Sequence, residues 1–268
     1  MRYPAFSLTL CFLTCLILIA GIATLSQAAN DAPKKEKKAA KPVALKSLMT
    51  IPGDTVFADD YQKPDLDKFQ KMRSRKGTWL LKGGTRCAGE DGALKLWPPT
   101  QEVAAKNAKW STGWTRAMIR QVPQDSVIGF RFMLLPVKGQ KKPPRFFFEN
   151  GHHKVRVNGG ADGVSLVVFD KTKKDPKFKI KAGTWYQVLF EIRGDEVVVQ
   201  FGKGPTLYYR DKKIAQERIG LQFGVISKGG ILLDDLLIRK VNDKARPDWP
   251  KTRKRLENAK KEPESSKK

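Results

Sequence analysis

The chain has 268 residues, and its 52 Lys and Arg against 27 Asp and Glu give a formal net charge of +25 at pH 7. A surplus this large favours polyanionic partners: nucleic acid, acidic or sulfated glycans, or an anionic membrane. The sequence lacks a phosphate-binding loop, a CxxC pair, an HExxH helix and a GxSxG elbow, which excludes the enzyme classes that these motifs mark.

The N-terminus has the pattern of a secretory signal. Arg2 precedes an almost wholly apolar run over residues 6–25, and Ser26-Gln27-Ala28 offers small residues for signal peptidase. We therefore predict a signal peptide over residues 1–28 and a secreted or periplasmic protein. The alternative is an uncleaved membrane anchor, since the run is nearly long enough to span a bilayer. After cleavage Cys87 would be the only cysteine, so the fold must depend on its core, and we expect Cys87 to be buried rather than nucleophilic.

Both ends of the mature chain are basic and poor in aromatic residues. Residues 29–47 form one such segment, and residues 242–268 form the other. This composition is typical of solvated disorder, and we predict a disordered linker and a disordered tail. Pro250 could open a short helix, but that helix would have no apolar stripe to dock it.

One domain is predicted between them, over residues 48–241, and its first half reads as short strands. The candidates are residues 55–57, 77–81, 93–97 and 114–120, with 93–97 as the partner of 77–81. Residues 101–114 could be a loop or a helical turn. Residues 126–137 alternate plainly between apolar and other side chains, as a strand with one buried face does.

The second half continues the pattern. Strands are predicted at residues 145–149, 154–157 and 164–169, separated by the hairpin signals Asn150-Gly151 and Asn158-Gly159-Gly160. Residues 171–176 are expected to be a basic loop, which with a second basic loop at residues 138–144 could rim a cleft that attracts anionic polysaccharide. Later strands are predicted at residues 207–209, 219–225 and 231–241.

The best-specified element is a β-hairpin over residues 184–201, with Gly194-Asp195 as its turn. Gly in the first central position suits a type II′ turn, which needs φ > 0 there. The register then pairs Arg193 with Glu196 and gives one wholly apolar face: Val188, Phe190, Ile192, Val197, Val199 and Phe201. A second sheet must cover that face. The opposite face carries Gln187, Glu191 and Gln200, and it would meet a ligand if this sheet were the concave one.

About a dozen short strands with turn punctuation and no long helix predict an all-β fold. The expected architecture is a β-sandwich or jelly roll of two antiparallel sheets.

Four segments carry a family resemblance. They are residues 57–61 (FADDY), 77–79 with 92–94 (GTW, GAL), 183–186 with 194–197 (GTWY, GDEV), and 219–222 with 234–238 (IGLQ, DDLLI). In this order they resemble the concanavalin A-like lectin/glucanase superfamily, and most closely its secreted bacterial 3-keto-disaccharide hydrolase domain family. The resemblance covers nearly all of residues 48–241. It implies a sandwich whose concave face binds saccharides.

Catalytic roles do not carry over from the resemblance. Laminarinase-type glucanases of the superfamily use an E-x-D-x-x-E strand, which this sequence lacks. A carboxylate beside an imidazole can perform acid/base chemistry, so Glu149 and His152 are the candidates if the protein is a glycoside hydrolase. The alternative is that the two adjacent histidines form a surface doublet. Whether the protein is an enzyme stays open.

Sugar binding needs aromatic faces and hydrogen-bonding groups. The candidate ligand residues are Trp97, Trp110, Trp114, Arg145 and His153. The alternative for the tryptophans is that they cap the core.

Carboxylates in the first and last strands suggest a structural calcium ion, because Ca²⁺ takes oxygen ligands. Asp60 and Asp235 are the candidate ligands, with Asp59 and Asp234 beside them. The alternative is that these side chains cap strand ends or face water. No other cofactor is expected.

Three functions remain open. The first is binding of carbohydrate, in particular anionic polysaccharide, without catalysis. The second is hydrolysis of the 3-keto-disaccharide type, and the third is a structural role in the cell envelope through the basic tails. No nucleic-acid motif is present, so specific nucleic-acid binding is not expected.

Overall fold

The computed structural model describes residues 45–62, 79–82, 84–105, 114–120, 122–139, 144–151, 154–217 and 220–259. The predicted signal peptide and most of the linker lie outside these residues. No helix within the described ranges is long and apolar enough to cross a membrane.

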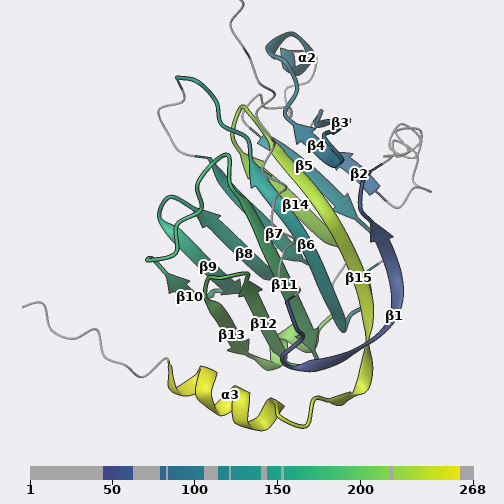
Figure 1. Ribbon diagram of the computed structural model, residues 1–268, viewed down its shortest axis with the longest axis vertical. Helices are drawn as coiled ribbons and strands as arrows, with labels where there is room; N and C mark the ends of the chain where they lie inside the picture. The colour runs from purple at the N-terminus through teal and green to yellow at the C-terminus, as the bar shows by residue number, and fades with distance from the viewer. Residues whose placement is uncertain are drawn as a thin grey trace, which may run out of the picture. The chain divides into compact units, whose positions relative to one another are not determined.

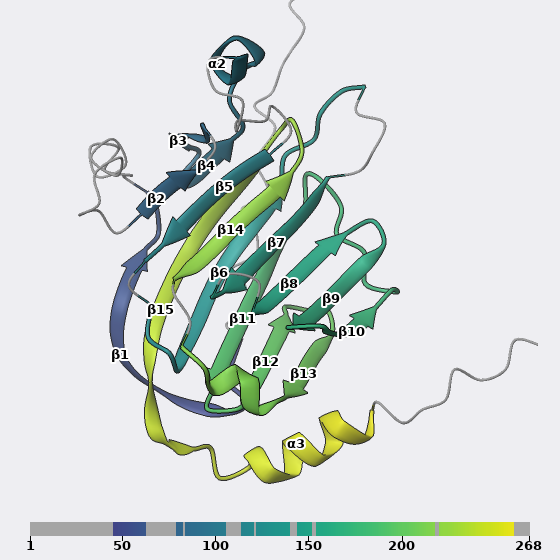
Figure 2. The ribbon, with the colours of Figure 1, turned by 180° about the vertical axis from the view of Figure 1, so that it is seen from behind.

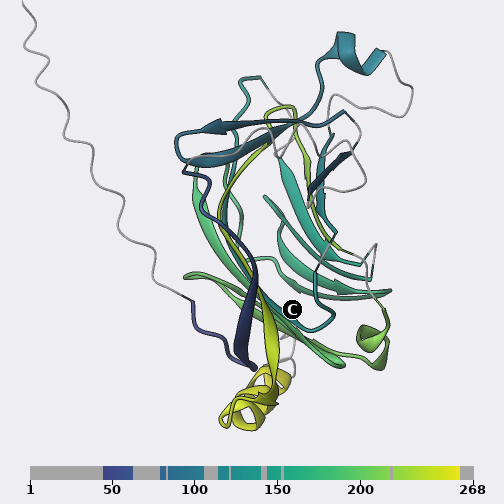
Figure 3. The same ribbon diagram turned by 90° about the vertical axis from the view of Figure 1, so that its right-hand side faces the viewer.

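Two antiparallel sheets face each other in this part of the chain (Figure 1, Figure 3). Sheet A contains, in spatial order, β13 (Thr206–Arg210), β12 (Glu196–Phe201), β11 (Trp185–Arg193), β6 (Ser126–Leu134), β15 (Ile231–Ala245), β4 (Ala93–Trp97) and β3 (Arg86–Glu90). Along its length β15 also pairs with β1 (Thr50–Asp59), so the first and last strands are neighbours, as expected.

Sheet B lies in front in Figure 2. Its spatial order is β10 (Lys171–Asp175), β9 (Gly163–Val168), β8 (Val155–Gly160), β7 (Arg145–Asn150), β14 (Leu221–Ile226), β5 (Trp114–Ile119) and β2 (Trp79–Lys82). Two short helices lie in connections, α2 (Gln101–Ala105) and the 3₁₀ helix η1 (Lys212–Ala215), while α3 (Trp249–Asn258) follows β15. The predicted fold class, a two-sheet antiparallel sandwich, is confirmed.

The hairpin of β11 and β12 has the predicted register. Arg193 lies opposite Glu196, and Val188 lies opposite Phe201. Gly194 has φ of 55°, as the first central residue of the turn requires. The predicted apolar face is wholly buried in one large core cluster between the sheets.

The core is rich in aromatic contacts across the two sheets. Phe130 on β6 meets Phe148 and Phe223 of sheet B edge-on, with ring centroids 5.1 Å apart in both pairs. Phe190 on β11 also meets Phe148 edge-on at 5.2 Å. These arrangements are the favoured geometry of aromatic pairs, and they join the hairpin to sheet B.

One predicted pairing is wrong. Residues 93–97 do not pair with residues 77–81; β4 pairs with β3, and β2 pairs with β5 in sheet B. Asp91 and Gly92 both have positive φ, 51° and 70°, which is the backbone of a type I′ turn. The chain therefore reverses at this Asp-Gly pair, and β3 forms where no strand was expected.

The expected basic loop at residues 171–176 is also wrong. Residues Lys171–Asp175 form β10, which pairs with β9 at the edge of sheet B. Lys171 and Lys173 lie on one side of the strand and Lys174 on the other, and the strand pairs despite this basic composition.

The polar face of the hairpin is covered by the start of the domain. The Glu191 carboxylate is fully buried and accepts hydrogen bonds from three consecutive backbone N–H groups at 2.7 to 3.1 Å, those of Leu48, Met49 and Thr50. The hydroxyls of Ser47 and Thr50 bond to the same carboxylate. Ligand contact at Glu191, which the sequence left open, is therefore excluded by this segment.

The end of the domain covers the neighbouring part of the same face. The Glu196 carboxylate accepts hydrogen bonds from Tyr208 Oη at 2.7 Å and from Trp249 Nε1 at 3.1 Å. Trp249 and Leu256 of α3 are buried with Met49 in a second apolar cluster. The prediction of a disordered tail is therefore wrong for residues 242–259, because α3 does have apolar side chains that dock it.

We predict that Glu191→Gln destabilises the domain by about 2–4 kcal/mol. The amide would place an NH₂ group against buried N–H and O–H donors, leaving several of them unsatisfied. Urea unfolding measures the change. The matched control is Glu102→Gln, since Glu102 is exposed on α2, and it should change stability by less than about 0.5 kcal/mol. Equal effects of the two substitutions would show that the Glu191 contacts contribute nothing.

Candidate functional site

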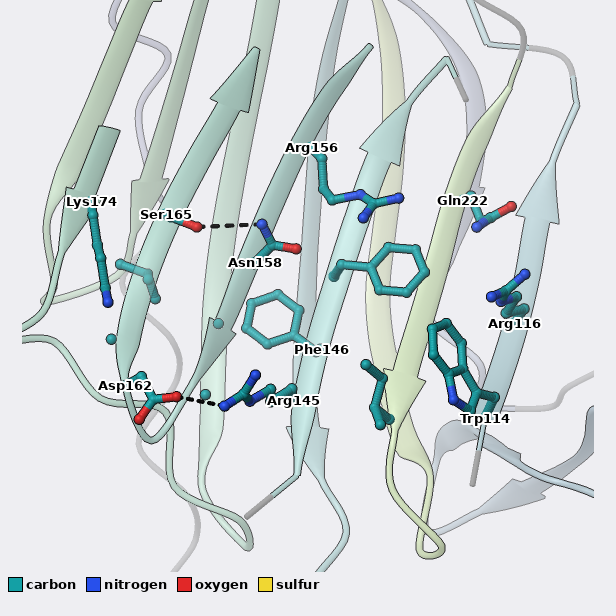
Figure 4. Close-up of a pocket in the computed structure, with 16 residues that line it drawn as sticks. Trp114, Arg116, Arg145, Phe146, Arg156, Asn158, Asp162, Ser165, Lys174 and Gln222 are labelled. Carbon is teal, nitrogen blue, oxygen red and sulfur yellow. Dashed lines mark hydrogen bonds and ion pairs between the residues drawn. The ribbon is translucent and has the colours of Figure 1, made fainter. Parts of the chain in front are cut away.

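A cavity of about 430 Å³ lies on the outer face of sheet B (Figure 4). Its lining comes from β5, β14, β7, β8, β9 and β10, so the cavity crosses most of the sheet. The inward side chains of the same strands belong to the core, so the lining comes mainly from the alternate residues, with the core residues Phe146 and Val164 reached at one end.

The middle of the cavity is one row of cross-strand neighbours. Lys174 pairs with Ser165, which pairs with Asn158, and the row continues through Phe147 and Gly224 to Arg116. Asn158 Nδ2 donates to Ser165 Oγ at 3.3 Å. Strands lie about 4.8 Å apart, so this row offers a new side chain at each such step. The arrangement suits an extended ligand with repeating polar groups.

The floor of the row depends on a glycine. A Cβ at Gly224 would lie 2.2 Å from Phe147 Cζ, so the Phe147 ring occupies the space that any other residue would fill. The Arg156 guanidinium stacks on this ring, 4.7 Å from its centroid. The floor therefore carries a guanidinium group supported by an aromatic ring.

Glu149 fixes that charge in place. Its carboxylate is buried, and Oε2 accepts from Arg156 Nε at 2.7 Å and lies 2.6 Å from Arg156 Nη2. Glu149 therefore holds Arg156 instead of standing open to a substrate. Such two-point contact orients a guanidinium strongly.

One end of the cavity is aromatic. Trp114 lies opposite Ile226, which is 39% exposed, and the Arg116 guanidinium lies 4.4 Å from the Trp114 ring centroid. An apolar ring beside a cation is a suitable surface for the C–H face of a sugar that also carries an anion.

The other end is charged. Arg145 Nη2 lies 2.8 Å from Asp162 Oδ2, and Figure 4 shows Lys174 extending toward the same end. Gly160 makes room for the Arg145 stem, because a Cβ there would lie 3.1 Å from Arg145 Cγ.

The structure brings together some of the residues predicted from sequence. Trp114 and Arg145 line the cavity, and Glu149 lies beside it as the partner of Arg156. Trp97 is on β4 of sheet A, stacked with Arg86 and not among the lining residues. Trp110, His152 and His153 lie outside the described residues, so these three assignments stay predictions.

Reasoning from sequence missed most of the polar lining. Arg116, Arg156, Asn158 and Lys174 were not singled out. A signal was available, since Trp114 and Arg116, like Arg156 and Asn158, stand two residues apart in strands and share a face.

The carboxylates proposed for calcium have partners within the chain. Asp59 Oδ1 accepts from Tyr61 N at 2.8 Å, while Asp234 and Asp235 both pair with Arg131. Asp60 accepts from Gln62 N at 3.2 Å. In the described ranges, no group of three or more His, Cys, Asp or Glu residues could hold a metal ion. The calcium site stays a prediction without support from these contacts.

Cys87 is half-buried on β3 and packs against the core. Burial raises the pKa of its thiol, which disfavours the thiolate that a nucleophile needs.

Comparisons with known proteins were made by sequence and by structure. No protein-family model matches the sequence, and the search of curated proteins found no match either. Among solved structures, a non-specific endo-β-1,3(4)-glucanase of glycoside hydrolase family 16 aligns with a TM-score of 0.51 and 10% identity, over 75% of this chain and 95% of the glucanase.

Two smaller proteins from Bacillus subtilis also align. A protein of unknown function with a galectin-like fold gives a TM-score of 0.49 and 10% identity, over 73% of this chain and 100% of that one. A family 66 carbohydrate-binding module gives 0.43 and 12%, over 61% of this chain and 96% of the module. At these identities the likeness shows the fold alone, a jelly-roll β-sandwich of two antiparallel sheets. Membership of the 3-keto-disaccharide hydrolase family stays a prediction.

We predict that Gly224→Ala destabilises the domain by about 1–3 kcal/mol, because the new methyl group must displace the Phe147 ring. Gly129→Ala on β6 is the matched control. A Cβ there would meet only Leu189 Cδ1, at an ordinary 3.7 Å, so stability should hold or rise slightly. Thermal unfolding measures both. A Gly224→Ala protein as stable as the control would contradict the described floor.

Proposed function

We propose that the protein is an exported carbohydrate-binding protein that holds an anionic polysaccharide on the outer face of sheet B without cleaving it. The apolar run at residues 6–25 and the small residues that follow it support export. The fold supports a saccharide ligand through the resemblance to superfamily members that bind or cleave glycans.

The observation that carries the proposal is the charge of the cavity. Four cationic side chains line it, Arg116, Arg145, Arg156 and Lys174, against the lining carboxylate of Asp162 and the buried carboxylate of Glu149 that pairs with Arg156. Charges of one sign in a cleft concentrate ligands of the opposite sign. Asn158, Ser165 and Gln222 add groups that can exchange hydrogen bonds with hydroxyls, and Trp114 adds a stacking surface.

The geometry argues against hydrolysis at this cavity. Glycoside hydrolysis needs two carboxyl groups on opposite sides of the scissile bond, one of them able to give a proton. Among the described lining residues Asp162 is the only acid, and Glu149 is buried and bound to Arg156.

Trp114→Ala should weaken binding to dextran sulfate at least about tenfold, which corresponds to ~1.4 kcal/mol, because it removes the stacking surface. Isothermal titration calorimetry measures the affinity. Trp185→Ala is the matched control, since Trp185 is 39% exposed on sheet A and also has an arginine, Arg131, on its ring. Binding that is unaffected by Trp114→Ala, or equally weakened by both, would place the ligand elsewhere. No binding of any polysaccharide would overturn the proposed function.

We also expect the protein to release no reducing ends from polysaccharides or 3-keto-glycosides above the level of a heat-denatured sample. Colorimetric detection over a day provides the measurement. Turnover by the native protein that disappears in Glu149→Gln would contradict this expectation and restore Glu149 as a catalytic residue, provided that the variant remains folded.

A further inference from the structure

Two arginines of the cavity, Arg156 on its floor and Arg145 at its charged end, have carboxylate partners of opposite character. Glu149, the partner of Arg156, has a side chain that is 1% exposed, whereas Asp162, the partner of Arg145, is 67% exposed. Arg145 itself is 63% exposed. The carboxylate of the first pair is buried, whereas both members of the second pair are exposed to solvent.

Asp162 is also placed where it can move. It lies in the turn between β8 and β9, outside the paired residues of both strands. Its side chain can therefore leave Arg145 without breaking a backbone hydrogen bond of the sheet. An exposed ion pair contributes little net stability, so the exchange of one carboxylate for another costs little.

We propose that Asp162 occupies the position of the ligand's own anionic group, and that a carboxylate or sulfate on the sugar replaces it at Arg145. This inference rests on the proposed function and names the group that the site selects. A carboxylate or sulfate can meet the Arg145 guanidinium through two N–H groups, as Asp162 Oδ2 meets Nη2 now. Lys174, which lines the same end, adds attraction for that group.

The exchange makes Asp162 a residue that determines specificity. A neutral polysaccharide leaves the Arg145–Asp162 pair intact and gains nothing from either residue. An anionic one must displace Asp162, and until Asp162 has moved away the two negative charges repel each other. Asp162 therefore competes with the ligand, and its removal should strengthen binding to anionic ligands alone.

The test compares Asp162→Asn with the wild-type protein by calorimetry on three probes: dextran sulfate, polygalacturonate and uncharged dextran. We expect affinity for at least one anionic probe to rise about two- to fivefold, because the ligand no longer has to break an exposed ion pair. Affinity for uncharged dextran should not change. Dextran sulfate and polygalacturonate separate sulfate from carboxylate as the preferred group. Arg145→Ala should weaken binding to the same probe.

The matched control is Asp195→Asn. Asp195 pairs with Arg210 at 2.8 Å, is also solvent-accessible, and lies outside the cavity, so its removal changes the net charge by the same amount. If both variants gained affinity equally, the gain would come from the change in net charge alone, and the inference would be overturned. Unchanged or weaker binding by Asp162→Asn would overturn it as well, since Asp162 would then be neutral or a direct ligand contact. Failure of the wild-type protein to bind any probe would instead overturn the proposed function.

Discussion

The hydrogen bonds to the buried Glu191 carboxylate close the outer face of the β11–β12 hairpin. Three consecutive N–H groups of residues 48–50 converge on this side chain, and α3 docks nearby through Glu196. Both chain segments therefore lie over the outer face of the β11–β12 hairpin. Burying this carboxylate without such donors would cost much free energy of folding, so its burial depends on the segment over residues 48–50. The outer face of sheet B bears the cavity instead.

On sheet B, backbone glycines create the site as much as polar side chains do. Gly224 gives the Phe147 ring its place, and the ring in turn supports Arg156. Gly160 does the same for the stem of Arg145. A side chain that packs closely over a glycine of the neighbouring strand thus supports an arginine at the surface, without a deep pocket to hold it. Such preorganised groups lose little entropy when a ligand binds.

Much of the fold could be predicted from alternation and turn chemistry, because both are local. The hairpin over residues 184–201 was specified to the residue by its turn and its apolar face. The pairing of β3 with β4 was missed because the signal at Asp91-Gly92 was not used, although it too is local. The docking of α3 depends on Trp249 meeting Glu196, 53 positions earlier in the chain, which no local pattern reveals. The site residues also fall into two groups. Trp114 and Arg145 could be predicted from their residue type, whereas the role of Arg156 depends on its contacts with Phe147 and Glu149.

The edge strand β10 has a consequence for how copies of the protein behave toward one another. Its outer edge would present unpaired backbone groups to which another sheet could add. Three lysines lie along this strand: Lys171 pairs with Asp211, Lys173 donates to the Leu256 carbonyl, and Lys174 lines the cavity. A second copy would bring the same positive charges to the contact. Edge-to-edge growth of sheet B is thereby disfavoured. Of these lysines Lys174 also lines the cavity, so one side chain serves both the edge of the sheet and the cavity.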